Sequence, residues 1–337
     1  MTLRPKLSPR HYTTRAGAAS TAPMSTVPAW LRRTVPDAQR VANKDIEDVT
    51  LAAGAAIGLL DAVVRRQERW AGAWRQRLAL SAAAVTAKQA GRIEDECALR
   101  DAVLLTRPGD FLSVGPAGSM LLAWRRLTDR PAQNLLSEKN LAAVLEEFGY
   151  APDGQVLSDD LRQFGASAGM VGMLIGVFTA AERYGFARAF GCLLADALLA
   201  QRLGWAHAVP LLGTEAALGT GVRARRSAAG SVATSIETNP ERAKSLLAAQ
   251  ARAALRAIDL FIELERRASK LLAVAPKLRA KAADTVVEKL LSDDAIVASE
   301  QIAGMSDRGL RRLFDRLVEL GAVRELSGRP TFRIYGL

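Results

Sequence analysis

The sequence is poor in the residue types that build metal centres and disulfide frameworks. Its 337 residues include two cysteines, Cys97 and Cys192, and two histidines, His11 and His207. The cysteines lie far apart in apolar helical patterns, so we expect both to be buried core residues in a reducing compartment. Because no histidines and cysteines cluster at ligand spacing, the sequence predicts no bound metal.

Long hydrophobic runs are also scarce. Residues 163–181 carry no charge and approach the length of a membrane span. The run is rich in Gly, Ala and Ser, however, and charged helices flank it closely, so it is predicted to be a buried central helix. No apolar run near the start fits a secretory signal. The sequence therefore predicts a cytoplasmic protein with no membrane contact.

The motifs of common enzymes are missing. There is no phosphate-binding GxxxxGK[ST] loop and no GxSxG nucleophile motif, and the glycines at 54, 58 and 165–176 lie in helical patterns rather than after strands. The acidic residues at 94–96 are adjacent on a helix, so they point in different directions and favour a solvated face. The sequence predicts that the protein is not an enzyme and has no cofactor.

Helix-forming residues dominate what is present. About half of the chain is apolar, and only 5% is aromatic, which favours helices over sheet. Apolar residues recur at helical spacing in residues 45–66, 70–90, 93–106, 116–128, 137–148, 186–203 and 241–273. We expect a disordered basic tail at 1–28, an all-α body at 29–275 and an exposed connector at 213–235.

The end of the chain, residues 276–337, is predicted to be a winged helix-turn-helix domain of three helices and a β-hairpin. Asp284 caps the first helix, Ser299 caps a short second helix at 300–303, and Ser306 caps the third, which ends at Gly321. Strands follow at 323–326 and 331–335, with Phe332 on the inner face. The fold class is thus mainly α, with a C-terminal winged helix.

The predicted domain carries exposed arginines on its third helix and its wing. The net charge of +11 fits either an anionic partner or a proteome that is generally rich in arginine. A recognition helix presents its N-terminal residues to double-stranded DNA, and wing arginines bind phosphate. Residues 306–337 hold seven arginines and four acids, so the electrostatic attraction is modest. The predicted DNA-binding residues are Ser306, Arg308, Arg311, Arg312, Arg316, Arg329 and Arg333.

Two alternatives remain open at this point. The domain could serve as a protein–protein adaptor that binds acidic partners and no DNA. The long helix at 241–273 could form a homodimer, or it could pack onto its own body.

Four segments, residues 70–80, 94–102, 115–118 and 326–335, resemble an uncharacterised bacterial family, the domain of unknown function numbered 1403. That family is known mainly from alphaproteobacteria and often from their plasmids. The resemblance implies a bacterial cytoplasmic setting, and it brings no activity and no catalytic residues. The sequence as a whole predicts a DNA-binding regulatory or plasmid-associated protein.

Overall fold

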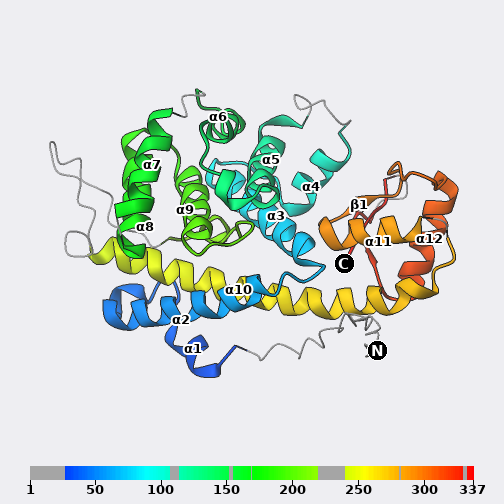
Figure 1. Ribbon diagram of the computed structural model, residues 1–337, viewed down its shortest axis with the longest axis horizontal. Coiled ribbons are helices and arrows are strands. Elements are labelled where there is room, and N and C mark those ends of the chain that lie inside the picture. Colours follow the sequence, from blue (N-terminus) through cyan, green and yellow to red (C-terminus); the bar gives the residue numbers. More distant parts are fainter. Residues whose placement is uncertain are drawn as a thin grey trace, which may run out of the picture.

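A helical body followed by a small three-stranded antiparallel sheet makes up the protein (Figure 1). The computed structural model describes residues 27–106, 114–151, 155–167, 169–218, 240–280, 282–328 and 332–337. Residues 1–26 of the predicted tail thus lie outside the described residues. Val27, which was assigned to that tail, is buried in the core, and Pro28 immediately precedes the first helix.

Most of the body helices form where the apolar periodicity predicted them, to within a few residues, but the helices Ala29–Thr34 and Gln155–Ser167 were not predicted as separate elements. The body helices are α1 (Ala29–Thr34), α2 (Ile46–Arg65), α3 (Ala71–Gln89), α4 (Glu96–Leu104), α5 (Gly115–Asp129), α6 (Glu138–Glu147), α7 (Gln155–Ser167), α8 (Met170–Arg183), α9 (Arg188–Arg202) and α10 (Pro240–Val274). Short 3-10 turns are η1 (Val41–Asn43), η2 (Ala132–Asn134), η3 (Leu212–Thr214) and η4 (Ala275–Lys277).

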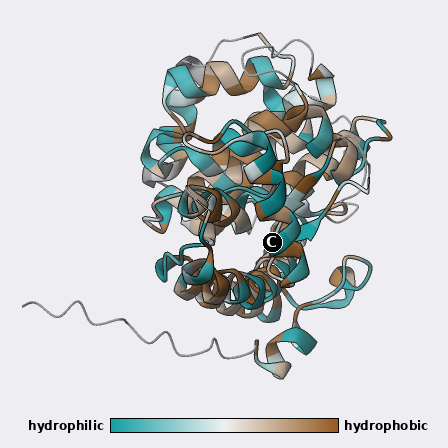
Figure 2. Ribbon diagram, turned by 90° about the vertical axis from the view of Figure 1, so that its right-hand side faces the viewer, coloured by the Kyte–Doolittle hydropathy of each residue, from teal (hydrophilic) through white to brown (hydrophobic). Residues whose placement is uncertain are grey.

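The charge-free run at 163–181 is not one helix. It covers the end of α7 and most of α8, and Gly169 between them is extended. Gly169 itself is a poor helix former, which favours a break at this point. The inner face of α8 is buried as predicted. Across the described residues no helix is both long and apolar enough to span a membrane, and helices in Figure 2 carry hydrophilic as well as hydrophobic stretches.

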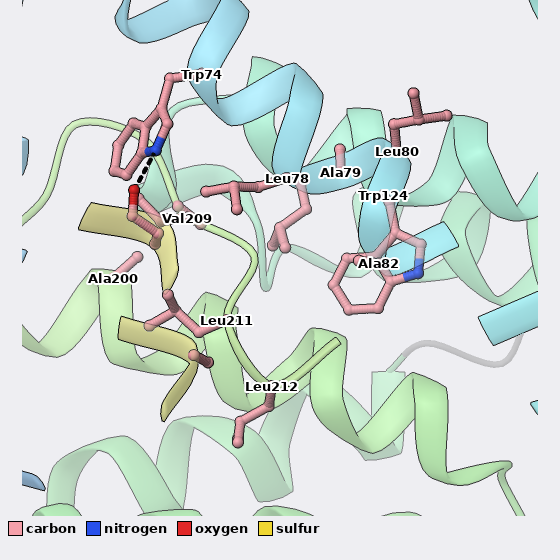
Figure 3. Packing of buried hydrophobic residues seen from close by; sticks show 14 of the residues in the cluster. Trp74, Leu78, Ala79, Leu80, Ala82, Trp124, Ala200, Val209, Leu211 and Leu212 are labelled. Carbon is pink, nitrogen blue, oxygen red and sulfur yellow. Dashed lines mark hydrogen bonds between the residues drawn. The ribbon is translucent and has the colours of Figure 1, made fainter. Parts of the chain in front are cut away.

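The long helix α10 uses its apolar face within its own chain. It runs beside α2 along one side of the molecule (Figure 1) and also contacts α8 and α3. Trp74 of α3 donates its indole N–H to the Ala257 carbonyl oxygen at 2.8 Å (Figure 3). The Trp74 ring also meets Phe261 edge-on, with 5.3 Å between centroids. Of the two predicted uses of this helix, the structure shows packing onto the body.

The segment that ends in η3 lies among buried hydrophobic side chains (Figure 3), and η3 contacts α3, α9 and α10. Its Leu211 and Leu212 are fully buried. The Asp196 carboxylate of α9 accepts the main-chain N–H groups of Leu211 at 2.8 Å and Leu212 at 3.1 Å. Gly213 lies so close to the Trp124 ring that a Cβ atom there would sit 2.2 Å from a ring carbon. The connector predicted to start at Gly213 is therefore buried at its beginning, and residues 219–239 lie outside the described residues.

The two cysteines differ in environment. Cys192 is buried in α9 as predicted, but Cys97 is exposed, so that prediction is wrong. Cys97 lies in the first turn of the short helix α4, whose buried positions are residues 99–101.

The C-terminal unit, defined here as residues 283–337, holds α11 (Ala283–Ser292), β1 (Ile296–Val297), α12 (Asp307–Glu319), β2 (Arg324–Glu325) and β3 (Ile334–Gly336). The sheet has the order β1-β3-β2. Ile296 pairs with Tyr335, and Glu325 pairs with the same residue from the other side. The predicted hairpin is thus present, and β1 is an additional strand.

Several details of this unit differ from the prediction. Residues 300–303 form no helix: the chain from β1 to α12 has no regular structure apart from turns at 298–299 and 303–304. Asp284 lies in the first turn of α11 rather than at its cap, since Ala282 precedes the helix in a left-handed conformation. Phe332 is 53% exposed rather than turned inward. It lies just before the short strand β3, where pairing does not yet fix side-chain direction.

The C-terminal unit is seated on the body through α11 and the sheet. A Cβ atom on Gly72 of α3 would lie 2.7 Å from the main chain of Ser292, so glycine permits this close approach. Arg77 of α3 and Arg267 of α10 both donate to the main-chain oxygen of Leu337, at 3.3 and 3.1 Å. The sheet is therefore fixed to the body from one side.

Candidate nucleic-acid interface

Helix α12 has one buried and one exposed face. Leu310, Leu313, Phe314 and Leu317 are buried. The Phe314 ring stacks on Tyr335 of β3, with centroids 4.3 Å apart and planes 6° from parallel. This stacking fixes the rotation of α12, and the polar side of the helix consequently faces away from the sheet.

The predicted site residues of α12 share this exposed side. Arg308, Arg311, Arg312 and Arg316 are all exposed, and their spacing of three and four residues places them along one stripe of the helix. The structure thus brings four predicted arginines onto a single surface, which we call the α12 basic face.

Charge along the α12 basic face is uneven. Arg316 pairs with Glu319 at 2.6 Å, and Asp315 lies 3.7 Å from Arg333 of the neighbouring sheet. Among the described residues, Arg308, Arg311 and Arg312 make no ion pair. Cations without an acidic partner are therefore concentrated in the N-terminal half of the helix.

The N-terminus of α12 adds to this positive end. The Ser306 hydroxyl caps the helix by accepting the Gly309 main-chain N–H at 3.2 Å, as predicted. Other N–H groups of a first helical turn have no partner within the helix, and the helix dipole is positive there. Ser306 thus fixes the start of α12 beside the three unpaired arginines.

The hairpin places further arginines near this helix. Arg333 is exposed, and its pKa is raised first by a hydrogen bond with the Tyr335 side chain and then by nearby acids. Arg324 of β2 is also exposed and was not among the predicted site residues. Arg329 lies outside the described residues.

The body leaves the α12 basic face uncovered. Its contacts with the described part of the C-terminal unit come mainly through α11, the chain between α11 and β1, the end of β3, and Leu326 after β2, whose main-chain oxygen accepts from Arg100 of α4 at 3.3 Å. Figure 1 shows α12 at the outer end of the molecule, on the far side of α11 from α3. A large partner can therefore reach the arginines without any rearrangement of the body.

Comparison with known proteins places the chain in a family. The family model described as "Protein of unknown function (DUF1403)" matches residues 16–337, and a search of curated proteins finds no match. The match covers most of the chain, including the body and the C-terminal unit, and it confirms the resemblance seen in the four sequence segments. The chain belongs to the DUF1403 family.

Proposed function

We propose that the C-terminal unit is a winged helix that binds double-stranded DNA, and that the protein is a DNA-binding regulatory or plasmid-associated protein. The order of α11, β1, α12, β2 and β3, with β3 central in the sheet, supports this fold. The second helix of a helix-turn-helix is replaced by the turns at 298–304. Buried Ile302 anchors this connection in its place.

The proposal depends chiefly on one observation: three arginines without acidic partners stand on the open N-terminal half of α12. In helix-turn-helix proteins the recognition helix enters the major groove with its N-terminal residues toward the bases. Arg308, Arg311 and Arg312 would then face base edges and flanking phosphates. Ser306 would orient main-chain N–H groups toward phosphate, and Arg316, Arg329 and Arg333 would contact the groove rim and the backbone.

The local acids limit the strength of binding. Asp315 and Glu319 follow the free arginines on the same helix, so Arg316 and Arg333 must exchange an internal pair for a phosphate contact. Because an exposed pair contributes little, this exchange costs about 1 kcal/mol or less for each arginine. The proposed contact is thus centred on three arginines, with the other cations secondary.

A mobility-shift titration on random-sequence duplex DNA tests the proposal. We expect salt-sensitive binding by the full chain, and weaker binding by the variant R308A/R311A/R312A. Losing three phosphate contacts would flatten the slope of log affinity against log salt by about 3. The matched control is R33A/R40A/K44A, which removes the same charge from exposed residues at the start of the body.

Equal weakening by both triple variants would show that net charge, not the α12 basic face, drives association. A wild-type chain that ignores duplexes at low salt would refute DNA binding. Such a result would favour the adaptor function, in which the same arginines bind an acidic protein.

A further inference from the structure

The end of α10 and the chain that follows it form a strongly basic surface. Residues 266–283 contain six lysines and arginines and no acid. Four of these cations are exposed and lie in the described part of the chain: Arg266, Lys270, Lys277 and Arg279. We call these four residues the α10 basic ridge. The first two lie four residues apart on one side of α10, and the other two lie at the end of η4 and just after it.

The α10 basic ridge has no partner within the described residues. None of its four side chains makes an ion pair or a hydrogen bond there. The acids that precede it are already paired, Glu263 with Arg267 and Glu265 with Arg66. Asp284, the next acid along the chain, lies in the first turn of α11 and pairs with none of the four. The positive charge of the ridge is therefore not neutralised from within the chain.

The helix dipole does not account for these cations either. A cation near the C-terminus of a helix is stabilised by the dipole only within the last turn. The last turn of α10 holds no basic residue. Arg266 and Lys270 lie before that turn, and Lys277 and Arg279 follow the end of the helix at Val274. The ridge therefore contributes little to the fold and is available to an external anion.

The ridge lies at the same end of the molecule as the proposed DNA-binding surface. In Figure 1, α10 runs along the length of the molecule and ends on the side that carries the C-terminal unit and α12. The η4 turn contacts α11, so packing holds the ridge beside the C-terminal unit. From Arg266 to Lys277 the ridge extends over about 18 Å at the rise of these helices, or about five base pairs of duplex.

We propose that the α10 basic ridge is a second, sequence-independent contact for the duplex that α12 binds. Its lysines and arginines would bind phosphates of the flanking backbone while the α12 basic face enters the major groove. This inference rests on the proposed function, because double-stranded DNA is the partner in both. Phosphate contacts position a protein without reading sequence. The ridge would thus supply affinity and orientation that the modest charge of residues 306–337 does not.

Acetylation of lysines in the full chain, with and without saturating random-sequence duplex, locates the contact directly. We expect bound DNA at low salt to slow the modification of Lys270 and Lys277 about fivefold or more, because phosphates cover their amines. Lys44 and Lys88 are internal controls, since both are exposed and neither makes an ion pair among the described residues. Peptide mass spectrometry should show equal modification of these two lysines with and without DNA.

A triple variant measures how much the ridge contributes to binding. R266A/K270A/R279A removes two arginines and one lysine, and R33A/R40A/K44A removes the same set from exposed residues at the start of the body. Alanine is a strong helix former and the ridge side chains have no partners, so the variant should fold like the wild type. In the mobility-shift titration it should bind about tenfold or more weakly at low salt and flatten the salt slope by about 3, and the control should do neither.

Three results would overturn the inference. They are equal acetylation of Lys270 and Lys277 with and without DNA, unchanged binding by the ridge variant, and equal weakening by the ridge variant and its control. If R308A/R311A/R312A still weakens binding in those cases, the proposed function stands without the ridge. Protection of the ridge lysines together with unchanged binding by the α12 variant would keep the ridge as a DNA contact and remove α12 from the site.

Discussion

The carboxylate of Asp196 is expected to control how the stability of this protein depends on pH. Asp196 is 1% exposed and accepts main-chain N–H groups from Leu211, Leu212 and, at 3.5 Å, Gly213. Burial raises the pKa of this carboxyl from 3.8 to about 7, although the three N–H donors oppose the rise. The folded chain therefore holds a proton on Asp196 at pH values where the unfolded chain has lost it.

The sign and size of the effect follow from that difference. Because the folded pKa is raised, the stabilising contribution is complete below about pH 4 and is lost as the pH rises through 7. Each pH unit in this window costs about 1.4 kcal/mol, so the total loss is about 4 kcal/mol.

The substitution D196N removes this titration. Asparagine keeps one oxygen for Leu211 and Gly213, but it leaves the Leu212 N–H without an acceptor, which costs about 1–3 kcal/mol at any pH. D196N should thus be less stable than the wild type at pH 5. It should be as stable or more stable at pH 8.

Urea titrations followed by circular dichroism at pH 5, 6.5 and 8 measure the free energies of unfolding. Other buried acids titrate in both proteins, so the difference between the two curves isolates Asp196. A difference that stays constant within about 0.5 kcal/mol across this range would show that Asp196 is already ionised in the folded chain at pH 5. D196A, which leaves all three N–H groups without an acceptor, should lose about 3–9 kcal/mol at pH 5, at about 1–3 kcal/mol for each group.

Further predictions concern packing and thiol reactivity. G213A should lower the thermal unfolding midpoint sharply, because its methyl group overlaps the Trp124 ring, and overpacking of this kind costs about 1–3 kcal/mol or more. G58A is the control: nothing lies within 4 Å of a Cβ atom there, so alanine should raise the midpoint slightly by its higher helix propensity. With an aromatic disulfide reagent at pH 8, only exposed Cys97 should react in the folded chain, since burial raises the pKa of the Cys192 thiol. Rapid modification of both thiols before unfolding, or a stable G213A, would contradict the packing described for α9 and η3.

Much of the helical architecture was predictable because it depends on local periodicity. The bounds of α2, α3, α5, α6, α9 and α10 fall close to the predicted ranges. Both ends of α12 could be predicted from the sequence. Ser306 caps its start, and Gly321 just after its end has the left-handed φ of 65° that glycine favours. Its four arginines share one exposed face because helical spacing alone puts them there.

Other features required contacts between distant segments. The strands β1 and β2 are two residues long and gain stability only by pairing with β3, so their extent could not be read from so few residues. The predicted helix at 300–303 had a suitable cap but no room for a full amphipathic turn, so local sequence does not stabilise it, and the chain there forms turns at 298–299 and 303–304 instead.

By itself the sequence determined where helices form, which side of α12 is polar and which family the segments resemble, because these depend on neighbouring residues. Only the tertiary structure decided that Gly213 is buried beneath Trp124, that α10 packs on its own body, and that Arg308, Arg311 and Arg312 are left without acidic partners. It alone placed the α10 basic ridge at the same end of the molecule as α12. Burial, ion pairing and the placement of charged surfaces depend on which elements meet, and local propensity carries no information about that.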